Sequence, residues 1–159
     1  DLQPDILQCY ADHYVANSKG DAWFSGVAEL LADLKQQGLK LAVATGKSRK
    51  GLDRVLNQTS SLELFDVTRA ASETKSKPDP LMLIEILQAA EIHVENAIMV
   101  GDTSYDLEMA QNIAMPRIGV SYGVHAPEVL ARYNPLAIAD DVADLHQLLL
   151  KHVNIRQAV

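Results

Sequence analysis

Short apolar runs alternate with amphipathic stretches along most of this chain. Apolar runs bounded by glycine or polar residues are typical of buried parallel strands, whereas apolar positions that recur with a helical period are typical of amphipathic helices. Strands and helices in alternation form a parallel sheet with helices on both faces. The pattern therefore predicts an α/β fold with a Rossmann-like parallel sheet. We expect strands at residues 39–44, 65–69, 97–101, 117–121 and 137–139, and helices at 50–56, 80–90, 106–113, 127–132 and 142–152.

Two further helices are predicted before this alternation begins. The apolar residues of 5–16 recur with a helical period, and the polar residues 17–21 form a turn that ends this helix. A second helix begins after Ser25, a suitable N-cap residue, and ends at Gly38. The helix at 5–16 is followed by no strand of its own, so it stands outside the alternation.

The composition indicates a single globular domain. The chain has 159 residues, of which 48% are hydrophobic, enough for a substantial core. Its formal net charge of -7 would repel a nucleic-acid backbone, and its single cysteine, Cys9, permits no internal disulfide bond. No apolar stretch has the length of a membrane span or a signal peptide. We therefore expect a cytoplasmic protein that binds neither nucleic acid nor membrane, and the sequence carries no signal for its oligomeric state.

Two acids follow the most apolar of the predicted strands. Asp102 comes directly after the strand 97–101, and Asp106 lies in the first turn of the next helix. Open α/β sheets bind ligands at the carboxyl ends of their strands, and carboxylate oxygens are the ligands that Mg²⁺ prefers. Acids near a helix N-terminus are also stabilising in their own right. The pair is therefore either a magnesium site or a helix cap.

A second polar turn follows the strand 39–44. Thr45, Gly46 and Lys47 place a hydroxyl and several backbone N–H groups just before a helix, an arrangement that binds oxyanions well. The alternative is an ordinary turn in which Thr45 is the helix N-cap. Nearby Arg49 and Lys50 extend a basic face that is either solvated or in contact with substrate.

Lys77 directly precedes Pro78 in the loop Ser76-Lys77-Pro78-Asp79-Pro80. Pro78 and Pro80 fix their own φ angles, and Pro80 is suited to start a helix. Lys77 is therefore held on a stiffened loop. A positive charge on such a loop suits a phosphoryl group or an aspartate nucleophile.

These residues carry a resemblance to a known family. Thr45 after its strand, Lys77 in Lys-Pro-Asp-Pro, and Gly101-Asp102 with Asp106 match the second, third and fourth motifs of the haloacid dehalogenase superfamily of phosphotransferases. Within that superfamily the chain resembles the phosphoglycolate phosphatase-like branch, which has a small helical cap. The three motifs stand in the family's order at fitting intervals.

The resemblance implies a Mg²⁺-dependent phosphomonoester hydrolase that acts on a small phosphorylated metabolite. Thr45 and the Gly46 amide would hold phosphate oxygens, and Lys77 would neutralise the phosphate and the nucleophile. Asp102 would ligate Mg²⁺, with Asp106 in direct or water-mediated support. The family reaction passes through an aspartyl-phosphate, in which a carboxylate nucleophile splits one hard step into two easier ones.

The family's first motif, which supplies that nucleophile, is not found. It consists of two aspartates that flank one residue and precede Gly-Thr, and no Asp-x-Asp occurs in this chain. The resemblance thus implies a cap remnant at 1–22 and a core at 23–159 that lacks its first strand. We expect this chain alone to be inactive. The alternative is a naturally inactive domain of the family that binds phosphate or a protein partner.

The missing strand has a consequence for the sheet. In the family it lies between the strands that correspond to 39–44 and 97–101. An empty position would leave unpaired N–H and C=O groups on both inner edges, at about 1 to 3 kcal/mol for each unsatisfied group. We therefore expect these two strands either to pair directly or to be separated by another segment.

Receiver domains of phosphorelay signalling also carry acids, a Ser or Thr and a Lys-Pro at one sheet edge, but there the acids come first, whereas Thr45 and Lys77 precede Asp102 here. The order therefore disfavours a receiver domain. The five histidines show no metal-ligand spacing and are expected to be surface or hydrogen-bonded residues.

Overall fold

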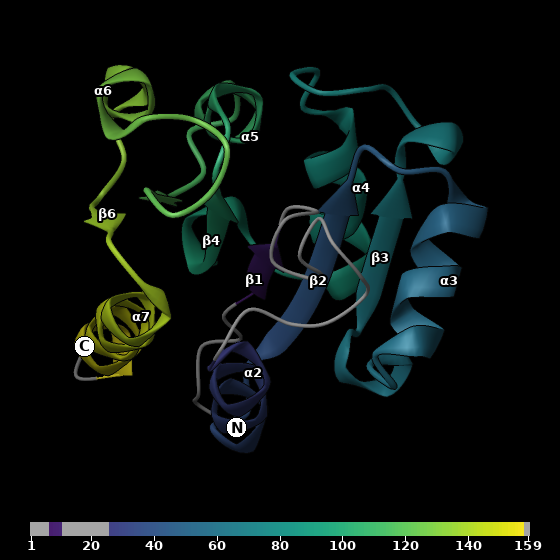
Figure 1. The fold of residues 1–159 in the computed structure, drawn as a ribbon, viewed down its shortest axis with the longest axis horizontal. Helices are drawn as coiled ribbons and strands as arrows, with labels where there is room; N and C mark the ends of the chain where they lie inside the picture. The colour runs from purple at the N-terminus through teal and green to yellow at the C-terminus, as the bar shows by residue number, and fades with distance from the viewer. Residues whose placement is uncertain (1–6, 11–25, 158–159) are drawn as a thin grey trace.

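The computed structural model describes residues 7–10 and 26–157 (Figure 1). Six strands form one sheet in the order β3-β2-β1-β4-β5-β6, and every neighbouring pair is parallel. The strands are β1 (Leu7–Tyr10), β2 (Lys40–Thr45), β3 (Val67–Ala70), β4 (Ala97–Gly101), β5 (Arg117–Val120) and β6 (Ile138–Ala139). The α-helices are α2 (Val27–Gln36), α3 (Arg49–Gln58), α4 (Leu81–Ala90), α5 (Ser104–Gln111), α6 (Pro127–Leu130) and α7 (Val142–Gln157). Four 3-10 turns complete the described elements: η1 (Leu62–Leu64), η2 (Ala71–Glu73), η3 (Val94–Asn96) and η4 (Ala131–Tyr133).

The helices cover both faces of the sheet. The chain passes outward from β2 to β3 through α3 and then returns across the sheet to β4 through α4. Right-handed crossovers in opposite directions place α3 and α4 on opposite faces. Helix α2 packs with α7 and β2, whereas α5 packs on β4 and β5. The predicted α/β fold, a Rossmann-like parallel sheet between helical layers, is confirmed.

The two longest strands explain why the pattern of apolar runs was a reliable guide. In β2 every residue after Lys40 is buried, and in β4 all five residues are buried. Strands covered on both faces need apolar side chains at every position instead of at alternate ones. Leu41, Val43, Ile98 and Val100 therefore belong to one core together with the inner faces of the helices.

The N-terminal segment differs from its prediction. The helix expected at 5–16 is wrong at Leu7–Tyr10, which form β1 in the middle of the sheet, between β2 and β4. Pairing with two strands satisfies backbone groups on both inner edges, and this tertiary gain overrides a local helical period. The expectation that another segment separates β2 from β4 is confirmed. Residues 11–25, which include the rest of that helix and the predicted turn, lie outside the described residues.

The start of α2 is set by a glycine. Gly26 is its N-cap, with a φ of 89°, and Gly38, with a φ of 84°, follows its C-terminus as predicted. Positive φ angles of this kind favour glycine because it has no Cβ atom. The prediction that Ser25 is the N-cap is wrong, because Gly26 takes that position. The proposed boundary between residues 22 and 23 lies outside the described residues, so the division into cap and core stays a prediction.

The other predicted strands and helices are present, with ends that differ by a few residues. Among the described helices, none combines the length and the apolar character needed to cross a membrane.

Candidate functional site

Thr45 is the last residue of β2 and is completely buried. Its hydroxyl accepts a hydrogen bond from the backbone N–H of Lys47, at 3.0 Å, and so shapes the turn that follows the strand. The alternative that Thr45 is the N-cap of the next helix is wrong. Ser48 takes that position in α3, where its hydroxyl accepts from the Gly51 N–H at 3.1 Å. The Thr45 turn therefore lies at the sheet edge, ahead of the helix and separate from its cap.

The sheet register places Asp102 level with Thr45. Tyr10 in β1 is the partner of Val43 in β2 and of Val100 in β4. Thr45 and Asp102 each follow those partners by the same number of residues. Because neighbouring strands lie about 4.8 Å apart, β2 and β4 are about 10 Å apart across β1. The two predicted site residues thus flank the central strand at one carboxyl edge of the sheet.

Asp106 belongs to the cap of α5. Thr103 is the N-cap residue, and its hydroxyl accepts from the Asp106 N–H at 3.3 Å. In return, Oδ2 of Asp106 accepts from the Thr103 N–H at 3.2 Å and from the Thr103 hydroxyl at 2.8 Å. This reciprocal pair is a capping box. The helix-cap alternative is therefore correct for Asp106, whereas Thr103 and not Asp102 is the N-cap.

The other oxygen of Asp106 binds Lys77. Lys77 Nζ donates to Oδ1 at 2.6 Å, and the two side chains are only 13% and 2% exposed. The Lys77 loop is also tied to α5 by Asn112, whose side-chain amide donates to the Pro78 carbonyl at 3.3 Å. The structure therefore brings two of the predicted residues into direct contact, from segments far apart in the sequence. Both carboxylate oxygens of Asp106 are engaged, which leaves it poorly placed to bind a cation directly.

Asp102 is also buried, but its contacts differ from those of Asp106. Its Oδ2 accepts from the Val124 N–H at 2.9 Å, and its backbone carbonyl accepts from the His125 N–H at 3.0 Å. The loop after β5 thus wraps around this residue. Within the described part of the chain, the carboxylate hydrogen bonds go to Oδ2, so Oδ1 is the oxygen best placed to meet a ligand.

Two glycines allow the carboxylates to lie this close to the backbone. A Cβ atom at Gly101 would lie 3.0 Å from Cγ of Asp106, and one at Gly123 would lie 2.7 Å from Cγ of Asp102. Real Cβ contacts are essentially never shorter than 3.0 Å. Gly123 therefore leaves room for the Asp102 side chain, a requirement that no local pattern in the sequence indicates.

We expect Gly123→Ala to destabilise the folded chain by about 2 kcal/mol, because the new methyl group must displace the buried Asp102 carboxylate. Urea denaturation followed by circular dichroism measures the loss. Gly51→Ala is the control, since its Cβ would lie 3.3 Å from the Ser48 hydroxyl in a helix. We expect that control to be neutral or stabilising by up to about 1 kcal/mol. Equal stability of the Gly123 variant and the wild type would contradict the close packing described above.

His125 was missed as a neighbour of the site. Its Nδ1 accepts from the Ser104 N–H, at 2.8 Å, and its ring lies 5.9 Å from that of Tyr105. The His125 ring thus accepts a hydrogen bond from the first residue of α5, although it lies on a different segment. The expectation that the histidines are hydrogen-bonded is confirmed for His125. A lone histidine far along the chain gives no signal that it will fold back against Asp102.

The described residues fit a divalent cation only in part. Within that part of the chain, no group of three or more His, Cys, Asp or Glu residues is arranged to hold a metal ion. Asp102 offers a hard oxygen donor of the kind that Mg²⁺ prefers, whereas Asp106 is committed to Lys77 and Thr103. The assignment of Asp102 and Asp106 to a metal stays a prediction, as do the catalytic and phosphate-binding roles of Thr45, Gly46 and Lys77.

Comparisons with known proteins show the family of this chain. Residues 2–120 match the family described as haloacid dehalogenase-like hydrolase. The chain is 33% identical over 152 residues to phosphoglycolate phosphatase of Vibrio vulnificus (strain CMCP6), which covers 94% of this chain and 67% of that protein. It is 31% identical over 127 residues to pyrophosphatase PpaX of Bacillus thuringiensis (strain Al Hakam), which covers 79% of this chain and 59% of that one.

A solved structure shows the same fold. The crystal structure of a predicted phosphatase from Clostridium acetobutylicum superposes with a TM-score of 0.76 at 28% identity, over 84% of this chain and 64% of that one. The chain spans about half to two thirds of the length of the curated relatives that it matches. With its family match, its relatives and its fold in agreement, the chain belongs to the haloacid dehalogenase-like hydrolases.

Proposed function

We propose that this chain provides the phosphate-binding and cation-binding core of a Mg²⁺-dependent phosphomonoester hydrolase that acts on a small phosphorylated metabolite. The observation that carries the proposal is the ion pair between the half-buried Lys77 and the buried Asp106, beside the strand ends that hold Thr45 and Asp102. A half-buried lysine at the carboxyl edge of a parallel sheet is well suited to an anionic ligand. The printed names of the relatives, a phosphoglycolate phosphatase and a pyrophosphatase, support a phosphorylated substrate.

Each residue would have a separate task. The Thr45 hydroxyl and the Gly46 amide would bind phosphate oxygens, and Lys77 would contribute positive charge beside them. Asp106 would hold Lys77 in place by the 2.6 Å contact and so act as a positioning residue instead of a direct metal ligand. Because Asp106 is buried and Lys77 is half-buried, water screens the charge of the lysine less than it would at the surface.

Asp102 is the residue that we assign to the cation. Its Oδ2 is held by the Val124 N–H, which would orient Oδ1 toward the ligand. When bound, a divalent cation supplies positive charge that stabilises the negative charge of the transferred phosphoryl group. Asp102 is only 2% exposed, so its carboxylate would enter this role already fixed by its surroundings.

The nucleophile is the part of the reaction that this sequence does not supply. A covalent route needs a carboxylate that attacks phosphorus, and the chain has no Asp-x-Asp in which the family places it. We therefore propose that these residues alone do not complete the reaction. That same absence favours a second candidate, a domain of the family that binds phosphate or a protein partner without chemistry.

Phosphate binding tests the site that both candidates share. Titration of the chain with inorganic phosphate, followed by NMR, should give saturable chemical-shift changes. Thr45→Val should raise the dissociation constant for phosphate about tenfold, because it removes one hydrogen bond to the anion. Thr45→Ser keeps the hydroxyl and should bind like the wild type. Thr59→Val is a further control, since the Thr59 hydroxyl bonds to Val55 at the far end of α3. Unchanged phosphate affinity in Thr45→Val would remove Thr45 from the site, and no binding by the wild type would overturn the proposal.

A further inference from the structure

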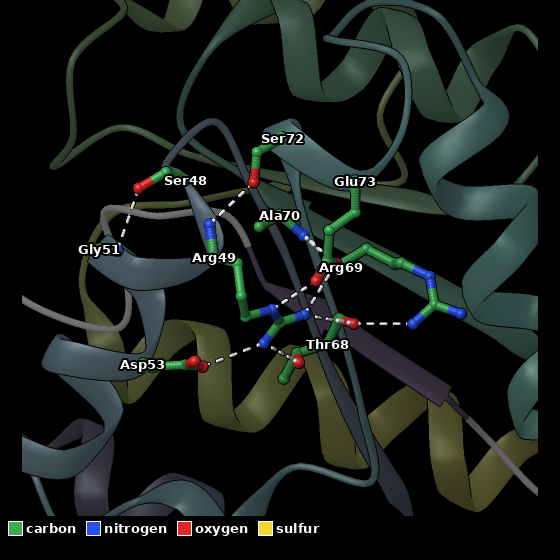
Figure 2. Close-up of polar contacts among 9 residues, drawn as sticks. All are labelled: Ser48, Arg49, Gly51, Asp53, Thr68, Arg69, Ala70, Ser72 and Glu73. Carbon is green, nitrogen blue, oxygen red and sulfur yellow. Dashed lines mark hydrogen bonds and ion pairs between the residues drawn. The ribbon is translucent and has the colours of Figure 1, made fainter.

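Arg49 is not part of a solvated basic face. Its guanidinium forms a two-pronged contact with Glu73, in which Nε donates to Oε1 at 2.5 Å and Nη2 donates to Oε2 at 2.9 Å (Figure 2). Nη1 donates to the Thr68 hydroxyl at 2.9 Å and to Asp53 Oδ1 at 3.2 Å. Lys47 and Lys50, its neighbours in the sequence, are exposed. Arg49 therefore joins the first turn of α3 to β3 and to the segment that follows it.

This contact continues a ladder that starts in the sheet. The pairing of β2 with β3 ends at Thr45 and Ala70. Beyond the strand ends, the Ala71 N–H donates to the Lys47 carbonyl at 2.9 Å, and the Arg49 N–H donates to the Ser72 hydroxyl at 3.0 Å. The contact between the Arg49 and Glu73 side chains lies back alongside β3, because Arg49 also donates to Thr68 and Glu73 also accepts from the Ala70 N–H. The turn after Thr45 and the segment 70–73 are thus linked at successive positions.

The same segment leads directly to Lys77. Its far end is fixed by the ion pair between Lys77 and Asp106, and its near end by the contacts of residues 70–73. Hydrogen bonds and ion pairs therefore link the Thr45 turn to residues 70–73 through Arg49 and Glu73, and the backbone of residues 74–76 continues from there to Lys77. The two groups assigned to phosphate lie on the segments that Arg49 connects.

We propose that Arg49 is a positioning residue. Through Glu73 it holds residues 70–77, the lysine segment, against the Thr45 turn, and so it sets the distance between the two phosphate-binding groups, Thr45 and Lys77. The inference rests on the proposed function, because it gives Arg49 a purpose only if Thr45 and Lys77 share a phosphate. Arg49 is not a catalytic residue, since its guanidinium is engaged by protein groups.

The chemistry of the pair suits this task. A guanidinium presents parallel N–H donors that match both oxygens of one carboxylate, whereas a lysine ammonium binds as a point charge without fixed direction. Glu73 Oε2 also accepts from the Ala70 N–H at 3.1 Å, so its carboxylate is oriented from two sides. Hydrogen bonding from Arg49 lowers the pKa of Glu73 to about 2, so the carboxylate stays ionised even at an acidic pH that would protonate an ordinary glutamate. The contact between Arg49 and Glu73, called the brace below, is therefore present at every pH at which a phosphate ester carries its full charge.

The experiment compares three variants of the full chain. Arg49→Lys keeps the charge but removes the two-pronged contact, and Glu73→Gln keeps the shape but removes the charge. Asp53→Asn is the matched control, because Asp53 pairs with Arg49 inside α3 and does not reach the lysine segment. The first measurement is the NMR signal of the Lys77 side chain, observed with isotope-labelled lysine. The second is the dissociation constant for inorganic phosphate.

We expect Arg49→Lys and Glu73→Gln each to shift the Lys77 signal and to weaken phosphate binding about tenfold, the size of effect that a coupled residue outside a site can have. The double variant should lose little more than either single one, because both remove the same contact. Asp53→Asn should leave the Lys77 signal and the phosphate affinity unchanged. A structural role alone would lower stability without altering either quantity in the folded chain.

Two results would overturn the inference. One is a Lys77 signal that stays in place in Arg49→Lys and Glu73→Gln, and the other is an equal shift in Asp53→Asn. The Lys77 signal is measured without a ligand. It therefore tests whether the contact between Arg49 and Glu73 positions Lys77 even if phosphate does not bind. Failure of the wild type to bind phosphate, together with a Lys77 shift in the two variants, would retain the brace and reject the proposed function.

Discussion

Replacement of Asp106 with asparagine is expected to destabilise the folded chain by about 3 to 5 kcal/mol, because it removes the buried negative charge that pairs with the Lys77 ammonium. A domain of this kind is typically stable by only about 5 to 15 kcal/mol, so the loss is a large part of the whole. The variant also weakens the capping box, since an amide cannot accept at both of the positions that Asp106 uses. Urea denaturation followed by circular dichroism measures the change.

Asp102→Asn is the matched control for that loss. Asp102 is equally buried, but its described carboxylate bond is to one backbone amide, so we expect a cost of about 1 kcal/mol. Adding Lys77→Met to Asp106→Asn should recover part of the stability, because it removes the positive charge that Asp106 neutralises in the wild type. Equal losses in Asp106→Asn and Asp102→Asn, with no recovery in the double variant, would show that the ion pair does not stabilise the fold.

The fold from Lys40 onward could be predicted because its strands are buried on both faces. A strand such as β4, with every residue buried, must be apolar throughout, and this leaves a clear run in the sequence. The segment Leu7–Tyr10 has no such run, and its apolar residues also fit a helix. Its strand conformation is set by the vacant positions on β2 and β4, which are far away in the sequence. Local periodicity does not contain that information.

Those site residues that directly follow a strand could be placed from the sequence. Thr45 and Asp102 follow strands that share one carboxyl edge, so topology alone brings them to that edge. The partner of Lys77 was not predictable, because Asp102 and Asp106 are both acids at the start of one helix. The structure separates them by contact: Thr103 and Lys77 engage Asp106, and the loop after β5 engages Asp102.

Arg49 is a second residue whose partner could not be predicted from the sequence. In the sequence it stands between Lys47 and Lys50 and looks like one member of a basic face. Its partner Glu73 lies beyond the next strand, and the distance between them closes only when β2 and β3 pair. A charge whose partner is on another segment cannot be distinguished by composition from a charge that faces water.

The 159-residue chain is expected to release no phosphate from p-nitrophenyl phosphate above the uncatalysed background, with or without Mg²⁺. Removal of the nucleophile from an enzyme with a covalent intermediate costs about 10⁶-fold in turnover, because the easier two-step route is lost. Thr45, Lys77 and Asp102 would still bind the phosphate and the cation. Magnesium-dependent turnover by homogeneous protein of this length would show that another carboxylate of this chain attacks phosphorus.

Restoring a nucleophile provides the positive half of this prediction. An N-terminal extension designed to carry the family's first motif, two aspartates that flank one residue and precede Gly-Thr, would supply the missing nucleophile on a strand of its own. That strand would compete with β1 for the single position between β2 and β4, so the site would gain a carboxylate beside Thr45 and Asp102. We expect turnover at least about 10³-fold above background, and the same extension with its first aspartate changed to asparagine should remain inactive. A folded, phosphate-binding extended chain without turnover would favour the inactive binding domain, because every group that the covalent route requires would then be present and the reaction would still not proceed.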